Sequence, residues 1–167
     1  NLNTDADYTT IKYNSSGVQQ WVQTYNGIAP TFTGVNNGDN RGQTMAVASN
    51  GDVYVAGESN NEIFTVKYLA DGSPGPGGWA RIFYSPCLPY SKALWDVNYH
   101  IKIAIDNNGN VCVSGDNGII KYSSSGAIIS GWPQTYGGTI WGMVMDGTGN
   151  VYVTGDAGTY RYNAAGG

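Results

Sequence analysis

His100 is the only histidine of the chain, so a Ser–His–Asp or Cys–His catalytic set would have to be built on this residue. No GxSxG sequence accompanies it, as the nucleophile of an α/β-hydrolase would require. Two carboxylates could hydrolyse a glycosidic bond, but Asp39, Glu58, Glu62 and Asp96 have no recognisable spacing. The sequence therefore predicts no catalytic residues and no cofactor.

The two cysteines, Cys87 and Cys112, occur in neither a CxxC pair nor the Cys/His spacing of a zinc site. Cys112 occupies the position that Tyr54 and Tyr152 occupy in two similar segments. This equivalence predicts that Cys112 is a buried packing residue. A disulfide between Cys87 and Cys112 is the alternative.

Segments such as DNNGN and DGTGN have the composition of calcium loops. They lack the D-x-D-x-D-G arrangement of an EF-hand, and hairpin turns explain them. Asn3, Asp5 and Asp7 form a weak calcium candidate, and we expect no other metal site.

The composition of the 167 residues favours short strands joined by tight turns, because charged residues make up only 12% while there are 25 Gly, 13 Tyr and 5 Trp. The net charge of −4 argues against nucleic acid or an anionic membrane as the main partner, since both require a basic patch. No run of 18 apolar residues is present to span a membrane. The composition is typical of exported proteins, and we expect a secreted or cell-surface location.

Three sequence features recur along the chain. The first is an apolar residue, then Lys or Arg, then Tyr, with Gly four positions after the Tyr. Its basic residues and glycines are Lys12 and Gly17, Lys67 and Gly72, Lys121 and Gly126, and Arg161 and Gly166. The second is a tryptophan that follows three of these copies, at Trp21, Trp79 and Trp132, and the third is G-[ND]-V-x-V-x-G at 51–57, 109–115 and 149–155. We expect the tryptophans to pack between repeats, and the basic side chains to pack their stems while their charged heads reach water or a carboxylate.

The repeat predicts four antiparallel strands, which we name A to D in chain order. The β-branched and aromatic runs are typical of strands, and the Asn- and Gly-rich segments between them are typical of hairpin turns. Strand A is expected in MAVAS, IKIAID and MVMD, strand B in the VxV motif, strand C in the IKY phrase, and strand D around each tryptophan. Four-stranded units that recur about every 40 to 58 residues indicate a β-propeller, with a solenoid as the structural alternative.

The sequences of the repeats are similar to those of a known family. GNVYVTG, TDADYTTIKYNSSGVQQWV and YNG resemble the SBBP-type β-propeller repeat of bacterial secreted and surface proteins. The resemblance covers nearly the whole chain and is strongest at 5–26 and 146–163. The chain departs from it at LADGSPGPGGW and at Ala48, which stands where Asp106 and Asp146 occur. The resemblance implies a propeller fold and an extracellular setting, with no defined catalytic residues.

We therefore expect an all-β segment of about three and a quarter blades: a partial blade at 1–26, blades at 43–85 and 99–137, and a partial blade at 140–167. Propellers usually close with four to eight blades. Apolar blade faces are unfavourable in water. The remaining blades are expected in a longer chain or, as the alternative, in another copy or another protein.

Variable loop length predicts where a ligand would bind. The A–B turns are short and nearly constant, whereas the B–C and D–A connections, which share the opposite end of the blades, vary in length. Loops on a rigid scaffold usually carry the binding residues. Polar residues beside aromatic ones suit a glycan or a peptide, and ordinary structural loops are the alternative. The candidates are Asn36, Asn37, Asp39, Asn40, Arg41, Glu58, Trp95, Asp96, Tyr99, His100 and Trp141.

Three hypotheses for the function follow from these observations. The first is a non-enzymatic propeller module for binding, adhesion or scaffolding. The second is part of an enzyme acting on polysaccharide, whose active site needs blades outside this chain. The third is a structural subunit of an extracellular assembly.

Overall fold

The computed structural model describes residues 7–25, 40–59, 62–74, 78–83, 100–115 and 118–167. These residues form β-strands and turns and contain no helix. The calcium candidates Asn3 and Asp5 and the loop candidates Asn36, Asn37, Asp39, Trp95, Asp96 and Tyr99 lie outside the described residues.

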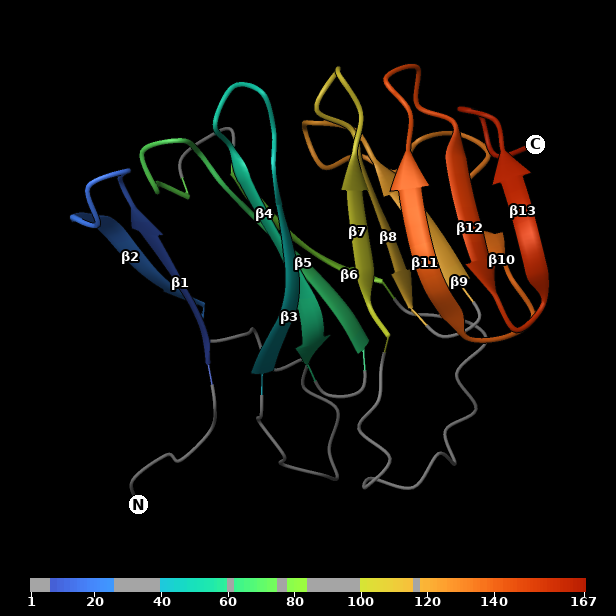
Figure 1. Ribbon diagram of the computed structural model, residues 1–167, viewed down its shortest axis with the longest axis horizontal. Helices are drawn as coiled ribbons and strands as arrows, with labels where there is room; N and C mark the ends of the chain where they lie inside the picture. The colour runs from blue at the N-terminus through green and yellow to red at the C-terminus, as the bar shows by residue number, and fades with distance from the viewer. Residues whose placement is uncertain (1–6, 26–39, 60–61, 75–77, 84–99, 116–117) are drawn as a thin grey trace.

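The strands form four antiparallel sheets, which we number as blades (Figure 1). Blade 1 consists of β1 (Tyr8–Tyr13) and β2 (Gln19–Tyr25). Blade 2 consists of β3 (Asn40–Val47), β4 (Val53–Ser59), β5 (Glu62–Tyr68) and β6 (Trp79–Phe83). Blade 3 consists of β7 (Lys102–Ile105), β8 (Val111–Gly115), β9 (Gly118–Tyr122) and β10 (Gln134–Thr135), and blade 4 of β11 (Ile140–Met145), β12 (Val151–Gly155) and β13 (Gly158–Tyr162).

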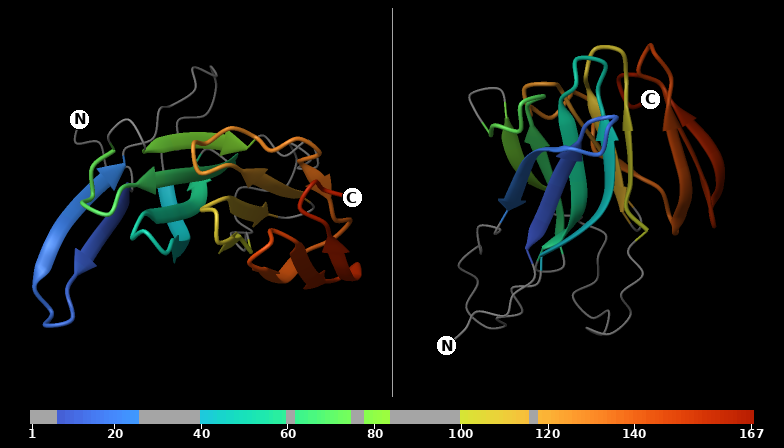
Figure 2. Two further views of the ribbon diagram at one scale, coloured as in Figure 1. Left: turned by 90° about the horizontal axis from the view of Figure 1, so that it is seen from above. Right: turned by 60° about the vertical axis from the view of Figure 1, so that its left-hand side comes forward.

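This topology is the one that the repeat predicts. Blades 2 and 3 contain strands A to D, blade 1 contains C and D, and blade 4 contains A to C. Seen from above, the four sheets follow one another along a curve (Figure 2). The all-β fold of four-stranded antiparallel units is therefore confirmed.

The turns that join the strands are hairpins held by short polar side chains. In the A–B turn of blade 3, the Oδ1 of Asp106 accepts hydrogen bonds from the backbone N–H groups of Asn108 and Asn110, both at 2.9 Å. Asp146 of blade 4 accepts the corresponding bonds from Thr148 and Asn150. These carboxylates serve the turns themselves, which confirms that hairpin turns explain the calcium-like composition.

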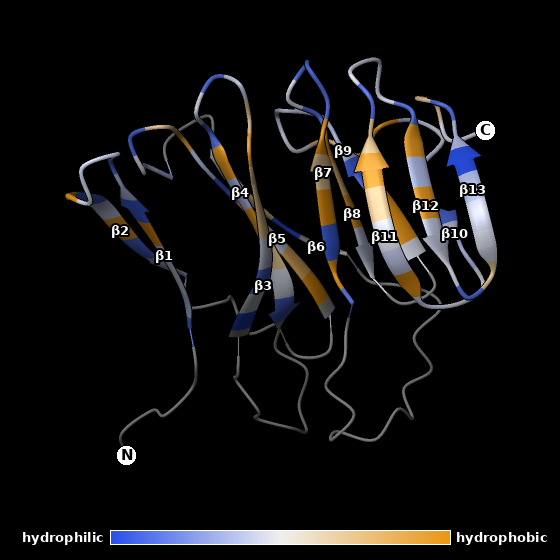
Figure 3. Cartoon of the chain, in the orientation of Figure 1, coloured by the Kyte–Doolittle hydropathy of each residue, from blue (hydrophilic) through white to orange (hydrophobic). Residues whose placement is uncertain are grey.

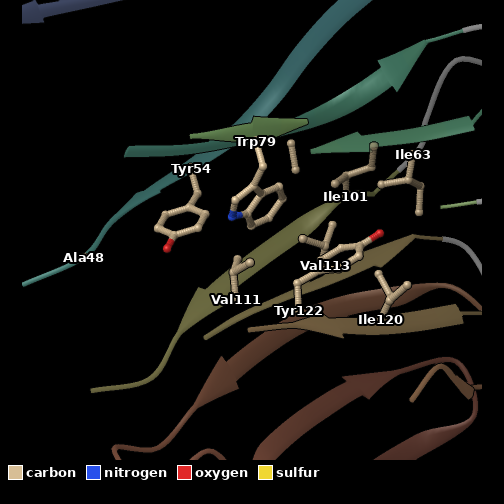
Figure 4. Packing of buried hydrophobic residues seen from close by; sticks show 10 residues of the cluster. Ala48, Tyr54, Ile63, Trp79, Ile101, Val111, Val113, Ile120 and Tyr122 are labelled. Atoms are coloured by element: carbon tan, nitrogen blue, oxygen red, sulfur yellow. The ribbon is translucent and has the colours of Figure 1, made fainter. Parts of the chain in front are cut away.

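The central strands of blades 2 and 3 are buried on both faces, as expected for sheets packed between two neighbours. Val53 and Val55 of β4 pack with β1 and β2 of blade 1, whereas Tyr54 and Ala56 face blade 3. Figure 4 shows Tyr54 and Trp79 pointing toward the residues of blade 3. Hydrophobic colour lies along β11 and β12 and in bands on β4 and β5, whereas the tips of the turns between β3 and β4 and between β7 and β8 are hydrophilic (Figure 3).

The interface between consecutive blades, which we call a joint, has a repeated set of hydrogen bonds. The basic residue of strand C and the tryptophan of strand D donate to the C–D turn of the next blade. Lys12 Nζ and Trp21 Nε1 both donate to the carbonyl oxygen of Ala70, at 2.8 and 3.3 Å. Lys67 Nζ and Trp79 Nε1 both donate to the carbonyl oxygen of Ser124, at 3.1 and 3.0 Å.

The third joint uses the same donors with one change of acceptor. Trp132 Nε1 donates to the carbonyl oxygen of Ala164 in the C–D turn of blade 4 at 3.2 Å, while Lys121 Nζ donates to Gly149 in the A–B turn at 2.6 Å. The repeated basic residue of strand C and the repeated tryptophan of strand D therefore connect each blade to the next. This finding confirms that the tryptophans pack between blades.

Two of the basic head groups are buried rather than in water. Lys67 Nζ lies 2.9 Å from Asp52, and Lys121 Nζ lies 4.0 Å from Asp106. Both pairs have side chains that are at most 9% exposed. Burial alone would raise the pKa of Asp52, but hydrogen bonds from Lys67 and Asn50 outweigh it and lower the pKa below its usual range.

The ion pair of blade 2 also explains the departure of the sequence at Ala48. Blade 3 carries its turn carboxylate at the first position, Asp106, whereas blade 2 has Ala48 there and carries Asp52 at the last position instead. Both carboxylates pair with the lysine of strand C in the same blade. The charge is therefore kept although its position in the turn changes.

Each tryptophan also covers the glycine of the neighbouring C–D turn in the first two joints. The backbone φ of Gly126 is +83°, and a Cβ atom added there would lie 2.8 Å from the indole of Trp79. Gly17 has a similar φ of +76°, but an added Cβ would meet nothing within 4 Å. The two glycines therefore share a backbone conformation and differ in what lies above them.

We expect Gly126→Ala to lower the free energy of unfolding at least twice as much as Gly17→Ala. The positive φ alone costs an alanine about 1 kcal/mol, whereas the methyl group at 126 must also displace a packed tryptophan. Urea denaturation of the two variants, followed by circular dichroism in dilute solution, measures the difference. Equal losses would show that Trp79 does not pack on this turn.

Two expectations need correction. Strand D of blade 3 contains only Gln134 and Thr135, and Trp132 precedes it, because Pro133 has no N–H to donate to a ladder. The first A strand extends over Asn40–Val47 and ends before Ala48, so it begins earlier than MAVAS. Cys112 is a free, buried cysteine at the centre of β8, which confirms its packing role and gives no support to the disulfide, whose other member Cys87 lies outside the described residues.

Candidate functional site

The A–B and C–D turns lie at one end of the blades, and we call the opposite end the loop end. The candidate site lies at this loop end. Here strand A begins, strand B ends and strand C begins, so residues from separate parts of the chain meet. His100 precedes β7, Trp141 lies near the start of β11, and Asp156 follows β12. Figure 1 shows β7 and β11 next to each other in neighbouring blades, in agreement with their contacts.

Trp141 is the exposed centre of this site. The antiparallel register of β11 with β12 shifts between Ile140 and Gly142, so Trp141 is an extra residue in a β-bulge. Bulges redirect a side chain away from the regular alternation of a strand. The side chain of Trp141 is 55% exposed, whereas Ile140 beside it is buried.

Two neighbours hold the indole ring in place. Its Nε1 donates a hydrogen bond to Asp156 Oδ1 at 2.7 Å. The ring of His100 contacts it edge-on, with centroids 4.3 Å apart and planes inclined by 61°. Trp141 is therefore an exposed aromatic surface that is fixed at its edge.

Asp156 is itself held by the backbone of the D–A connection. Its Oδ2 accepts a hydrogen bond from the N–H of Thr139 at 3.3 Å, and its own N–H donates to the carbonyl oxygen of Thr139 at 3.1 Å. The hydrogen bond from Trp141 lowers the pKa of the Asp156 carboxyl below its usual range, and hydrogen bonding from Thr139 acts in the same direction. Asp156 is thus a carboxylate at neutral pH.

A second pair of predicted residues meets at the loop end of blade 2. Arg41 of β3 and Glu58 of β4 are directly opposite in the ladder, and Arg41 Nη1 lies 4.0 Å from Glu58 Oε1. The hydroxyl of Tyr8 donates to the backbone carbonyl of Glu58 at 3.1 Å. A groove of about 760 Å³ is lined by Arg41, by other residues of β1, β3 and β4 and by Asp7.

The predicted candidates therefore form two pairs in the described part of the chain. His100 lies with Trp141, and Arg41 lies with Glu58. Asn40 belongs to β3, but its side chain lies outside the described part. Of the weak calcium candidates only Asp7 is described, and the described residues contain no group of three or more His, Cys, Asp or Glu that could hold a metal ion.

Asp156 was not among the predicted loop candidates, although the sequence contains a signal for it. An acidic residue follows the last glycine of the VxVxG motif in every copy, as Glu58, Asp116 and Asp156. Only Glu58 was a candidate. A regular position in the repeat was sufficient to identify Asp156, whereas its contact with Trp141 depends on the bulge in β11.

None of the described segments is a helix of sufficient length and apolar character to cross a membrane.

No family model matches the chain, and no curated protein matches it. Among solved structures, a streptogramin B lyase is similar at 12% sequence identity with a TM-score of 0.51, covering 93% of this chain and 47% of that one. A virginiamycin B lyase from Staphylococcus aureus has 11% identity and a TM-score of 0.34, covering 96% of this chain and 71% of that one. The chain thus spans about half the length of the streptogramin B lyase. The first likeness shows the fold alone, and it confirms the predicted β-propeller segment.

Proposed function

We propose that the chain is a non-enzymatic binding module that holds a carbohydrate ligand on Trp141 at the loop end. The exposed indole, fixed by Asp156 and His100, is the observation that supports this function. A flat aromatic ring can stack on the apolar face of a pyranose, and a rigid ring loses little conformational entropy on binding. The carboxylate of Asp156 and the imidazole of His100 supply acceptors and donors for hydroxyl groups beside the ring.

The setting that we propose is bacterial and extracellular, on the surface or secreted, with the chain as a member of the SBBP-type repeat family. The sequence motifs of the repeats, above all GNVYVTG, support membership of this family. The contacts between blades explain why these motifs recur, because their Lys, Trp and Gly residues connect each blade to the next. A binding or adhesion module fits a scaffold whose repeated lysines and tryptophans connect its blades.

Binding of the purified chain to a panel of glycans tests this proposal. For any glycan that binds, we expect Trp141→Ala to weaken the affinity by at least about tenfold, because an aromatic residue at the centre of a site usually contributes more than 1 kcal/mol. Asp156→Asn should weaken the affinity less, because it keeps the amide oxygen as an acceptor for the indole but removes the charge.

Asp146→Asn is the matched control, since Asp146 is a turn carboxylate at the opposite end of blade 4. Its affinity should equal that of the original chain. An equal loss in the Asp146 and Asp156 variants, or no loss in Trp141→Ala, would place the ligand elsewhere.

An enzyme that acts on polysaccharide is the alternative, and the same panel separates the two. Each glycan that binds is incubated with the chain and analysed for cleavage products. Turnover that disappears in Asp156→Asn would contradict a purely binding role.

A further inference from the structure

Every described joint has a donor side and an acceptor side. The donor side is the face of the earlier blade that carries the basic residue of strand C, and the acceptor side is the face of the later blade that carries the C–D turn. In the joint between blades 2 and 3, Tyr54, Trp79, Val111 and Tyr122 bury their side chains together. This arrangement indicates what each face requires as a partner.

Blade 4 exposes a donor side. Arg161 stands at the position of Lys67 and Lys121, which are 5% and 1% exposed, yet Arg161 is exposed and its side chain makes no hydrogen bond or ion pair within the described residues. Tyr152 stands at the position of Tyr54 and is 37% exposed, compared with 1% for Tyr54. The Tyr54 hydroxyl donates to Gly109 of the next blade, whereas that of Tyr152 turns back to Asp146 in its own blade.

Blade 1 exposes an acceptor side. Ser15 of its C–D turn stands at the position of Ala70 and Ser124. The carbonyl oxygens of Ala70 and Ser124 accept the hydrogen bonds from lysine and tryptophan in the other joints. The glycine of the same turn, Gly17, has open space where a Cβ would be, as already described. Ile11 is 42% exposed, although its equivalent Val66 in blade 2 is only 3% exposed.

The aromatic position of strand C shows the same contrast. Tyr13 of blade 1 is 56% exposed, while Tyr68 and Tyr122 at the equivalent positions are 3% and 1% exposed. Val18 and Val22 of blade 1 are exposed as well, at 57% and 47%. The open face of blade 1 is therefore an apolar surface of the kind that every other joint buries.

We propose that two copies of this chain associate head to tail, with the β1–β2 hairpin of one copy docked on the β11–β13 face of the other. In this joint the guanidinium of Arg161 donates to the carbonyl oxygen of Ser15 in the second copy, as Lys67 does to Ser124. Ile11 and Tyr13 then cover Tyr152. A second copy is the occupant because its hairpin carries the matching acceptor turn and apolar face, and because the contact continues the joints already present within one chain.

The joint between copies is expected to be weaker than those within the chain. Blade 4 has no described D strand, so the tryptophan that clamps the other joints is absent from the donor side. The contact is also heterologous, since different surfaces of the two copies meet, and such contacts build rings or open chains rather than only symmetric dimers. Association should therefore depend on protein concentration.

Light scattering after gel filtration over a range of concentrations tests the proposal. We expect a mass of 17.7 kDa at high dilution and multiples of this mass at high concentration. Arg161→Glu removes the donor and Ile11→Asp places a charge on the apolar face. Each variant alone should remain at the mass of one chain, because each lacks one of the two surfaces.

Mixing the two variants provides the decisive measurement. The intact hairpin of the Arg161→Glu chain can dock on the intact blade 4 of the Ile11→Asp chain, so the mixture should form a dimer of twice 17.7 kDa and no larger species. Ile128→Asp is the control for an added charge, since Ile128 is 55% exposed in blade 3, away from both faces. This variant should associate like the original chain, and near-ultraviolet circular dichroism checks that each variant is folded.

Three results would overturn the proposal. One is an original chain that stays at 17.7 kDa at every concentration. Another is association that persists in either single variant, which would place the contact on other surfaces. The third is a mixture of folded variants in which no dimer forms. Failure of glycan binding would leave this proposal intact, because the two surfaces lie away from Trp141 at the turn ends and faces of blades 1 and 4.

Discussion

Replacing Lys121 by Met is expected to lower the free energy of unfolding by about 3 kcal/mol. The side chain is only 1% exposed, donates to the carbonyl oxygen of Gly149 and faces the buried carboxylate of Asp106. Methionine keeps the apolar stem but leaves that carboxylate without its cation. The backbone carbonyl of Gly149 loses its donor at the same time. Urea denaturation followed by circular dichroism measures the loss.

Arg161→Met is the matched control, because Arg161 occupies the same position in blade 4 and is exposed. We expect this variant to change the free energy of unfolding by no more than about 0.5 kcal/mol in dilute solution. Adding Asp106→Asn to Lys121→Met should recover about 1 kcal/mol, because the amide oxygen still serves the turn while the unpaired charge is gone. Similar losses in Lys121→Met and Arg161→Met would contradict a role for the lysine in the joint.

Trp79→Ala should cost about 4 kcal/mol of unfolding free energy. The indole is 8% exposed and lies between Tyr54 and Tyr122, with ring centroids 5.7 and 5.4 Å away. Its Nε1 also donates to Ser124. The substitution therefore opens a cavity in the joint between blades 2 and 3 and removes a hydrogen bond across it.

Trp141→Ala serves as the comparison for Trp79→Ala, since it removes the same group from an exposed position. Its cost should stay below about 1 kcal/mol, because little surface is buried and the hydrogen bond to Asp156 is accessible to water. Trp79→Phe should fall between the two variants, since it keeps a ring in the joint but not the donor. A chain that tolerates Trp79→Ala as well as Trp141→Ala would show that the joints do not depend on the tryptophans.

The two alanine variants also separate scaffold from function. Trp79 recurs in the repeat and is buried, whereas Trp141 lies outside the repeat pattern and is exposed. We expect Trp79→Ala to reduce stability while leaving the glycan affinity of the folded fraction unchanged. The reverse is expected of Trp141→Ala. A propeller permits this separation because its repeated positions build the joints and its variable loop ends are free to carry a site.

The sequence by itself determined the strands and their order. Alternating β-branched and aromatic residues define each strand, and glycines with positive φ close the turns between neighbouring strands. These signals are local, since each hairpin pairs segments that are close in the chain. The variable lengths of the connections between strands identified Trp141 and His100 as candidates at the loop end. The local signals placed strand D of blade 3 incorrectly where Pro133 interrupts the ladder, and they placed the start of the first A strand too late.

Only the tertiary structure decided which residues meet across the blades. The hydrogen bonds between consecutive blades connect residues 28 to 58 positions apart, as between Lys121 and Gly149 or Lys12 and Ala70. The contact of His100 with Trp141 likewise joins two blades and depends on the bulge in β11. No local pattern encodes such contacts, because they arise from the packing of whole sheets against one another. The same packing makes Lys67 and Lys121 buried partners of carboxylates while Arg161, at the same position of the repeat, stays in water.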